Sequence, residues 1–473
     1  MDQENITGGL PERGPGWKRL TFSTRAWLAV GLILAAPLLI GNAMTHYTTQ
    51  YDVNGDIAHE VTETDYFIAL VLFLLLTTTF ITILLLKSEP SQMAPFLVMG
   101  LIFLLAVYLR AACLGAPVTN DYTRFLHEWV VKLRDSGGFA ALGRLESDYN
   151  MPYLYILALI SYLPVDDLLL IKFISIVADM VMAWVAMSLV REYGLSESKR
   201  LLVLAGVLFA PTIWLNSAYW AQCDVLYAVF ALLCLRFALR GRPWLAVVMA
   251  GLGFAFKLQI IFFLPLLVVF LITKHIKWRH ILAFPGVFLA ISLPALALGR
   301  PFISLFQIYP QQVSQYSGFL NLNAPSAYAF LLQSANYPMF VAGIAAAGLF
   351  LVFLLYWLFL NKGKIDGNTL LTLALLLCTA IPWCLPSMHE RYFFMADLFA
   401  VIYAVVRPKR FYVAPLMIYA SYAGYHAYLF GSYLPFSMWV PSIFVALIAG
   451  FMFMDLREQL GVPTKPAPDV LGG

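Results

Sequence analysis

The chain has 473 residues, of which 61% are hydrophobic and only 12% are charged, and its formal net charge is +4. Soluble globular proteins are about half apolar and about a quarter charged, so this composition excludes an ordinary soluble enzyme and indicates a polytopic membrane protein. The five cysteines are scattered, mostly inside apolar runs, without a CxxC pair, so we interpret them as packing residues rather than a disulfide framework.

The N-terminal region is polar to about residue 25, and basic residues precede the first apolar run. That run has neither the short apolar core nor the clear cleavage site of a secretory signal, so we predict an uncleaved span. The C-terminal sequence GVPTKPAPDVLGG is rich in proline and glycine and predicts a loose tail.

Successive apolar runs predict an all-α membrane bundle with about fourteen transmembrane helices. A twelve-residue stretch, 153–164, is closed by a proline and is predicted to lie at the interface without crossing. The expected spans are 26–46, 66–86, 95–115, 166–190, 201–217, 222–240, 243–256, 258–274, 280–298, 337–360, 368–386, 391–406, 410–430 and 434–454.

The distribution of basic residues orients this bundle. With a cytoplasmic N-terminus and a non-spanning segment at 153–164, one set of loops holds 21 of the 30 lysines and arginines. The opposite side receives the acidic loop YDVNGDIAHEVTETD. This asymmetry satisfies the positive-inside rule, so we predict a multi-pass protein of the plasma (inner) membrane with both termini in the cytoplasm.

Four polar clusters then fall on the extracytoplasmic side. They are the long connection after the third span, with Asp121 and Asp148; the turn NSAYWAQCDVLY, with Gln222 and Asp224; the hairpin GFAFKLQIIFF, with Lys257 and Gln259; and the sequence His389-Glu390-Arg391. The cytoplasmic turns are plain basic strings, whereas these outer turns mix carboxylates, cations, imidazole and amides. Such a mixture is typical of a site for an anionic ligand and a proton transfer.

These residue types suit a sugar carried on a lipid phosphate. A carboxylate can accept the proton of an attacking hydroxyl, and lysine, arginine and histidine can hold a phosphate at the level of the headgroups. The residues alone leave simpler interpretations open, since interfacial anchors, helix caps and salt bridges also place such side chains at helix ends.

The order of motifs carries a family resemblance. A DY on a long outer loop is followed by GGF, SDYNMPYLYILALISYLP, NSAYWAQCD, FKLQIIFFLPLL and LPSMHERYFF. From about residue 95 to 404 this order resembles the GT-C superfamily of membrane glycosyltransferases. It is most similar to the bacterial branch related to the second mannosyltransferase of glycosylphosphatidylinositol assembly. Met151 and Ala221 depart from that pattern, in which they replace a proline and a glycine.

The resemblance implies a domain organisation. Residues 95–406 would form the GT-C-like catalytic core, with a long first outer loop containing interfacial helices, and 407–456 the C-terminal transmembrane helices. Residues 26–94 would be an added helical hairpin of unknown role, and 1–25 and 457–473 would be cytoplasmic segments.

The resemblance also implies an activity: transfer of a hexose, mannose or glucose, from a polyprenyl-phosphate donor to an acceptor hydroxyl by a single inverting displacement. The acceptor would be a glycan, a glycolipid or a protein. Asp121 matches the catalytic base, and Asp148 is the rival base, a sugar-binding carboxylate or a helix cap.

Lys257, His389 and Arg391 are then expected at the donor phosphate, with Glu390 orienting one of them. The remaining candidates bind the sugar or the acceptor, although an aromatic belt would also explain the tyrosines. They are Tyr122, Gln222, Asp224, Gln259, Tyr309, Gln312, Tyr316 and Asn323.

The sequence does not support a cofactor or a divalent metal. His127-Glu128 and His389-Glu390 are adjacent pairs without the i, i+4 spacing of a metal site, and no Walker or dinucleotide motif and no nucleic-acid-binding surface is present. Two alternatives stay open at this stage: a transporter or flippase of lipid-linked sugars, and a glycan polymerase.

Overall fold

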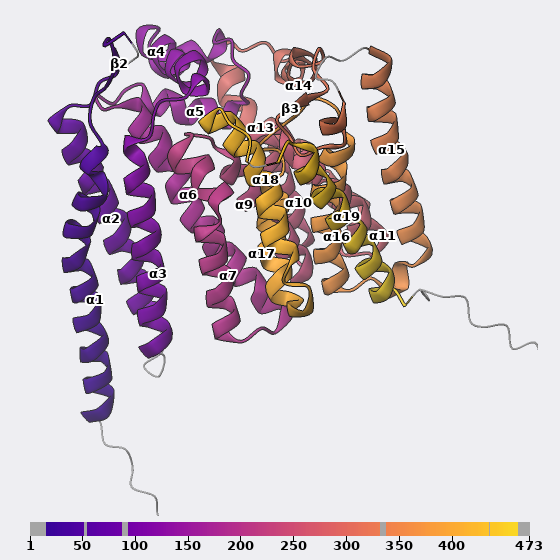
Figure 1. Cartoon of the computed structure of the whole chain (residues 1–473), viewed down its shortest axis with the longest axis horizontal. Coiled ribbons are helices and arrows are strands. Elements are labelled where there is room, and N and C mark those ends of the chain that lie inside the picture. Colours follow the sequence, from indigo (N-terminus) through magenta and orange to yellow (C-terminus); the bar gives the residue numbers. More distant parts are fainter. Residues whose placement is uncertain (1–15, 52–53, 88–92, 332–336, 435, 462–473) are drawn as a thin grey trace, which may run out of the picture.

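The computed structural model describes residues 16–51, 54–87, 93–331, 337–434 and 436–461. Within these ranges the chain is an all-α bundle with two short pairs of β-strands, as predicted (Figure 1). Most of the predicted cytoplasmic segment 1–25 and of the predicted tail 457–473 lies outside the described residues.

The predicted N-terminal hairpin consists of two long helices that stand beside the third helix at one edge of the bundle (Figure 1). From Ala26 in the first helix and after Asp65 in the second, most side chains are apolar, which is the pattern of a helix surrounded by lipid and protein. The elements are α1 (Gly16–Ala43), η1 (Met44–His46), β1 (Gln50–Tyr51), β2 (Ile57–His59), α2 (Glu63–Lys87) and α3 (Met93–Ala112).

The long connection after α3 folds into short helices at the upper end of the bundle in Figure 1. Helix α5, which overlaps the stretch 153–164 predicted not to cross, has ten residues and is about 15 Å long, half of what the hydrocarbon core requires. The elements are η2 (Cys113–Gly115), η3 (Tyr122–Leu126), α4 (His127–Asp135), η4 (Gly138–Gly143) and α5 (Met151–Ile160).

The middle of the chain forms the body of the bundle. Its elements are α6 (Asp167–Leu189), η5 (Val190–Tyr193), α7 (Glu197–Phe209), α8 (Pro211–Trp214), η6 (Leu215–Tyr219), α9 (Asp224–Leu239), α10 (Pro243–Phe256), η7 (Leu258–Phe262), α11 (Pro265–Ile272), α12 (Trp278–Ile281) and α13 (Ala283–Ala297).

The last part of the chain completes the bundle and returns to the upper end twice. Its elements are α14 (Ser304–Gln315), β3 (Asn321–Leu322), η8 (Ala327–Phe330), α15 (Tyr337–Leu360), η9 (Lys362–Lys364), α16 (Gly367–Cys384), β4 (Met388–His389), α17 (Phe394–Val406), η10 (Pro408–Arg410), α18 (Val413–Phe430) and α19 (Trp439–Gln459).

A helix overlaps each of the fourteen predicted spans, but the count of about fourteen membrane-crossing helices is not confirmed. In the described part of the chain, eight helices are long and apolar enough to cross a membrane, or nine if the pair Glu197–Phe209 and Pro211–Tyr219, bent by 49°, is one span. Several others, such as α10 and α17, fall short of the ~20 residues that a straight crossing needs.

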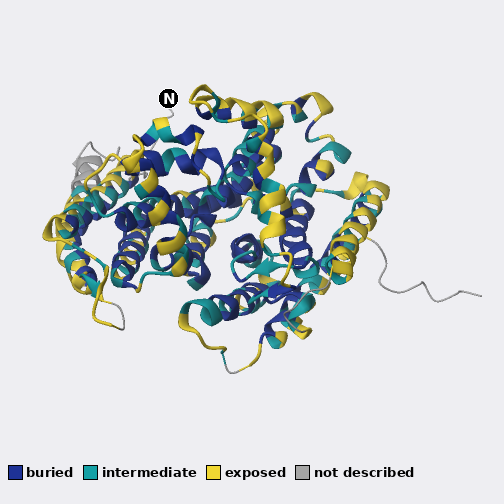
Figure 2. Ribbon diagram, turned by 90° about the horizontal axis from the view of Figure 1, so that it is seen from above, coloured by how far each residue is buried: buried dark blue, intermediate teal, exposed yellow. Residues whose placement is uncertain are grey.

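Burial separates an inner from an outer set of helices. Helices α16 and α17 are buried along nearly their whole length, whereas α15 exposes most of its surface (Figure 2). The described chain starts and ends at the lower end of the bundle in Figure 1, opposite the short helices α4, α5 and α14. The upper end is therefore where the connecting segments come together.

Candidate functional site

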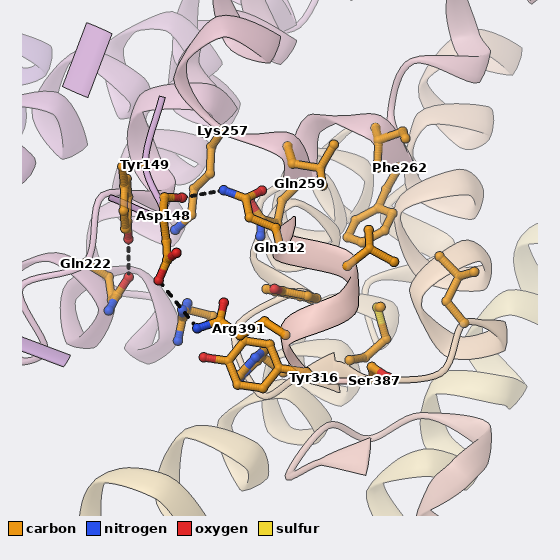
Figure 3. Close-up of a pocket in the computed structure, with 18 of the residues that line it drawn as sticks. Asp148, Tyr149, Gln222, Lys257, Gln259, Phe262, Gln312, Tyr316, Ser387 and Arg391 are labelled. Carbon is orange, nitrogen blue, oxygen red and sulfur yellow. Dashed lines mark hydrogen bonds between the residues drawn. The ribbon is translucent and has the colours of Figure 1, made fainter. Parts of the chain in front are cut away.

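A cavity of about 390 Å³ opens among the connecting segments at this upper end. Nine of the fourteen predicted site residues line it, from five segments that are distant in sequence (Figure 3). They are Asp121, Asp148, Gln222, Lys257, Gln259, Gln312, Tyr316, His389 and Arg391. The structure therefore brings together side chains from all four predicted outer clusters and from the loop between α13 and α15.

The other side of the cavity is apolar. Its lining includes side chains of η7 (Leu258–Phe262), Phe340 and Ile344 of α15, and Leu385 and Met388 before and within β4. The cavity thus has a polar wall and an apolar wall, the combination expected for an amphipathic ligand.

Asp121 is held by three donors from separate parts of the chain. Oδ2 accepts hydrogen bonds from Gln222 Nε2 at 2.7 Å and Arg391 Nη1 at 3.4 Å, and Oδ1 accepts one from the hydroxyl of Tyr428 at 3.0 Å. The carboxylate still exposes 22% of its side-chain surface and lines the cavity. It is both fixed in place and accessible, as a proton acceptor must be.

Irregular backbone shapes the two turns that meet at Asp121. A π-helix, Tyr122–Leu126, begins directly after Asp121, and a second, Leu215–Tyr219, precedes the turn with Gln222. Single π-helical turns occur frequently at functional sites. In the second turn Ala221 has φ 65°, a left-handed conformation that glycine adopts most readily.

Lys257, which lines the cavity, forms a buried ion pair. Its Nζ lies 2.5 Å from Asp224 Oδ1, and the two side chains are 7% and 0% exposed. Asp224 Oδ2 accepts a further hydrogen bond from Asn216 at 2.7 Å and lies 3.9 Å from Arg391 Nε. Lys257 also lies 5.3 Å from the ring centroid of Tyr149. Since an ammonium has three donors, those not used by Asp224 can serve a ligand.

The segment with His389 and Arg391 is fixed by strand pairing and by a glycine. Strand β4 pairs in parallel with β3, which places the His389 ring edge-on to Tyr316 at 4.5 Å. Helix α18 packs closely here because a Cβ at Gly424 would lie only 3.0 Å from the Cβ of Glu390. A glycine is therefore required where α18 passes this segment.

Arg391 lies among three carboxylates, those of Asp121, Asp224 and Glu390. Burial by itself would lower the pKa of Arg391, but Asp121, Glu390 and Asp224 raise it well above its usual value, so the guanidinium keeps its charge. It also lies over the ring of Trp220, 5.1 Å from the centroid. This fixed cation faces the cavity.

Asp148 lines the cavity beside Tyr149 and is contacted by α14 (Figure 3). Gln312 donates its amide N–H to the Asp148 carbonyl, and Gln315 donates to its carboxylate at 3.4 Å. Because Nε2 of Gln312 is used in this way, its Oε1 is an acceptor that finds no donor among the described residues. Such an acceptor fits a ligand hydroxyl.

Five predicted site residues do not line the cavity. Tyr122 turns away from it and donates to Asp167 at 2.6 Å, because successive residues of a helical turn point in different directions. Asp224 and Glu390 are fully buried behind the wall as partners of Lys257 and Arg391. Tyr309 stacks on Phe254, and Asn323 accepts a hydrogen bond from Tyr433.

Sequence reasoning missed contributions from α18 and from residues beside the predicted ones. Tyr428, at the end of that helix, donates a hydrogen bond to Asp121, and the Tyr425 hydroxyl accepts one from Asn216 at 3.0 Å. A signal was present, since tyrosines recur every three residues from Tyr419 to Tyr428 and mark one helical face. Tyr149 and Gln315 also line the cavity.

No group of three or more histidine, cysteine, aspartate or glutamate side chains in the described chain is arranged to hold a metal ion. The cavity is lined by a hydrogen-bonded carboxylate, the buried cation of Lys257, the partly exposed cation of Arg391, an imidazole, several amides and an apolar wall. These groups can bind an anion with an apolar tail and accept a proton beside it.

Comparison with known proteins places the chain in a family. The model of glycosyltransferase family 87 matches residues 149–388, a little over half of the chain. No curated protein matches. The crystal structure of ArnT from Cupriavidus metallidurans bound to undecaprenyl phosphate has a TM-score of 0.46 and 14% sequence identity, with 76% of each chain covered. The predicted relation to the second mannosyltransferase of glycosylphosphatidylinositol assembly stays a prediction. The chain belongs to glycosyltransferase family 87 and is a multi-pass membrane protein.

Proposed function

We propose that this glycosyltransferase transfers a hexose, mannose or glucose, from a polyprenyl-phosphate donor to an acceptor hydroxyl on the extracytoplasmic face of the plasma membrane. The observation that carries the proposal is the cavity in which Asp121, Lys257, His389 and Arg391 share a polar wall opposite an apolar one. A lipid-linked sugar phosphate has matching parts: an apolar tail for the apolar wall, and an anion and a polyol for the polar wall.

The reaction is a single displacement. The acceptor oxygen attacks the anomeric carbon of the donor sugar while Asp121 takes the proton of that hydroxyl. The bond between the anomeric carbon and the phosphate oxygen breaks, and the polyprenyl phosphate leaves with the electron pair. Attack from the face opposite the leaving group inverts the anomeric configuration.

The cations of the polar wall stabilise the negative charge that develops on the leaving phosphate. Arg391 keeps its charge, because the surrounding carboxylates raise its pKa, and Lys257 and His389 line the same space. Charge-assisted hydrogen bonds to phosphate are about twice as strong as neutral ones, and they act where the transition state gains charge.

The sugar itself would lie among amides and rings. Asp148, Gln259, Gln312 and Tyr316 line the same cavity as Asp121, and their polar groups suit sugar hydroxyls. Asp148 is then a sugar-binding carboxylate rather than the base, because it lacks the three donors that fix Asp121.

The proposal is tested with purified protein and a panel of polyprenyl-phosphate sugars, with and without EDTA, using mass spectrometry to detect free polyprenyl phosphate and glycosylated product. We expect turnover with one hexose donor, and none in Asp121→Asn. The matched control is Asp135→Asn, an exposed carboxylate at the end of α4, which should retain full activity. Full activity in Asp121→Asn would overturn the assignment of the base.

The extracytoplasmic position has its own test. Ser314 is exposed on α14 next to the cavity, and a cysteine placed there should react with a membrane-impermeant maleimide in intact cells. The native Cys113, Cys223, Cys234 and Cys378 are buried and should stay silent. Labelling only after the cells are opened would place the cavity on the cytoplasmic side.

A further inference from the structure

The N-terminal hairpin reaches the segment that carries the base. Its tip, from η1 to the start of α2, lies at the upper end of the bundle near α4 (Figure 1). There Gln50 of β1 donates to the Ala116 carbonyl at 2.9 Å and accepts from the Val118 backbone N–H at 3.2 Å. Both contacts fall shortly before Asp121 in the chain, so the hairpin fixes the segment that leads to the base.

The same tip also holds the start of α6. The carboxylate of Asp166, 2% exposed, accepts a hydrogen bond from the Tyr47 hydroxyl at 2.7 Å and lies 3.1 Å from His59 Nε2. The Asp166 backbone N–H donates to Asp65 at 2.9 Å. Three side chains of the hairpin therefore fix one residue at the beginning of α6.

The next residue of α6 holds the chain after Asp121. Asp167 accepts a hydrogen bond from the Tyr122 hydroxyl at 2.6 Å, and its other oxygen lies 2.8 Å from His127 Nδ1. Tyr122 is 3% exposed, and the His59 ring lies edge-on to it at 6.0 Å. Burial raises the pKa of Tyr122 far above its usual value, so the phenol stays a donor.

We propose that the N-terminal hairpin is a positioning clamp for Asp121, acting through Gln50 before it and through the pair Asp166-Asp167 and Tyr122 after it. Asp121 faces the cavity while its neighbour Tyr122 is tied to α6 in the other direction. The clamp assigns a function to the added hairpin and makes Tyr122 a positioning residue that does not touch the sugar. This inference rests on the proposed role of Asp121 as base.

A general base needs such support. Catalytic groups must lie within about 0.5 Å of their productive position, and a misplacement of about 1 Å costs about a hundredfold in rate. The π-helix that starts at Tyr122 is a less regular backbone than an α-helix, so it depends more on contacts from outside. The hydroxyl of Tyr122 and the amide of Gln50 supply these contacts on the two sides of Asp121.

The test uses Tyr122→Phe and Gln50→Leu in full-length protein, with Tyr51→Phe, an exposed tyrosine of the same β1 strand, as control. For a positioning role we expect kcat to fall about tenfold in each of the first two variants, since a partial displacement of the base is a fraction of the hundredfold limit. The KM for the donor should stay within about twofold, because no group that contacts the donor has changed. The control should match the wild type.

The same substitutions in an Asp121→Glu background distinguish a positioning role from a loss of protein stability. In Asp121→Glu the carboxylate is already moved by one methylene, so adding Tyr122→Phe or Gln50→Leu should cost much less than in the wild type. A loss equally large in both backgrounds, or an unchanged kcat in both single variants, would overturn the clamp. If Asp121→Asn is inactive while these variants are normal, only the clamp fails, whereas an active Asp121→Asn removes the proposed function as well.

Discussion

The buried ion pair between Lys257 and Asp224 gives a sharp test of how the site is held together. We consider Lys257→Met, Asp224→Asn and the double variant. Each single change leaves one charge without its main partner in a place where the two side chains are 7% and 0% exposed. Breaking a buried pair in this way typically costs 3–5 kcal/mol of folding free energy, whereas removing both charges is often nearly neutral.

The surroundings decide where each variant falls in this range. After Lys257→Met, Asp224 keeps the hydrogen bond from Asn216 at 2.7 Å and the guanidinium of Arg391 at 3.9 Å, so we expect a cost of about 3 kcal/mol. After Asp224→Asn, the ammonium keeps mainly the ring of Tyr149 at 5.3 Å, so we expect about 4 kcal/mol. The double variant should cost less than either single variant.

The measurement is equilibrium unfolding in mixed detergent micelles with added SDS, checked by thermal unfolding with a thiol-reactive dye. The dye reports unfolding because four of the five cysteines are buried in the described structure. Strictly additive free energies for the two substitutions, or wild-type stability in Lys257→Met, would refute the reasoning. A stable double variant with a raised KM for the donor would in addition separate phosphate binding from folding.

Three further outcomes follow from the geometry. Tyr428→Phe removes the hydroxyl that donates to Asp121 at 3.0 Å, and kcat should fall about tenfold, measured by product formation, while the melting temperature changes little. Gly343→Ala places a Cβ 1.9 Å from the Tyr328 hydroxyl. This clash should displace α15, which contributes to the apolar wall, and raise the KM for the lipid donor. Gly348→Ala is the control, because a Cβ at that position of the same helix has no atom within 4 Å. The hydrogen bond to Asp167 is the main cause that raises the pKa of His127 above 6.5, against burial, so its stabilisation is present below that pH and is lost as the pH rises. Melting temperatures from about pH 6 to about pH 9 should therefore fall less steeply in His127→Gln than in the wild type.

The positions of the helices could be predicted because apolar composition alone decides them. A helix overlaps each predicted span, and the short α5 (Met151–Ile160) covers most of the stretch 153–164. The number of crossings could not be predicted in the same way, since proline, polar residues and π-turns shorten helices inside apolar runs. The pair α7 and α8 shows this, because Pro211 interrupts a single apolar segment and bends it by 49°.

The composition of the cavity was predictable, but the pairing within it was not. Loop charges indicated which clusters share one end of the bundle, and the cavity contains residues from all of them. The partner of Lys257 and the third donor to Asp121 depend on contacts between residues 33 and 307 positions apart. No local pattern encodes such contacts. The direction of the Tyr122 side chain could not be predicted either, because adjacent side chains in a π-helix point in different directions.

Backbone strain is concentrated around this cavity. The non-glycine residues with positive φ include Ala221, Asn323 and Ser387, and each stands at a turn that delivers a site residue. Ala221 precedes Gln222, and Asn323 and Ser387 flank the paired strands that carry His389. Such conformations cost about 1–3 kcal/mol each and persist only where surrounding contacts impose them. At Ser387 these contacts are visible: its N–H donates to the Leu320 carbonyl at 2.8 Å and its hydroxyl to the Phe319 carbonyl at 2.7 Å. The packed bundle thus stabilises these strained turns, and the turns hold the polar side chains in the directions that the proposed transfer requires.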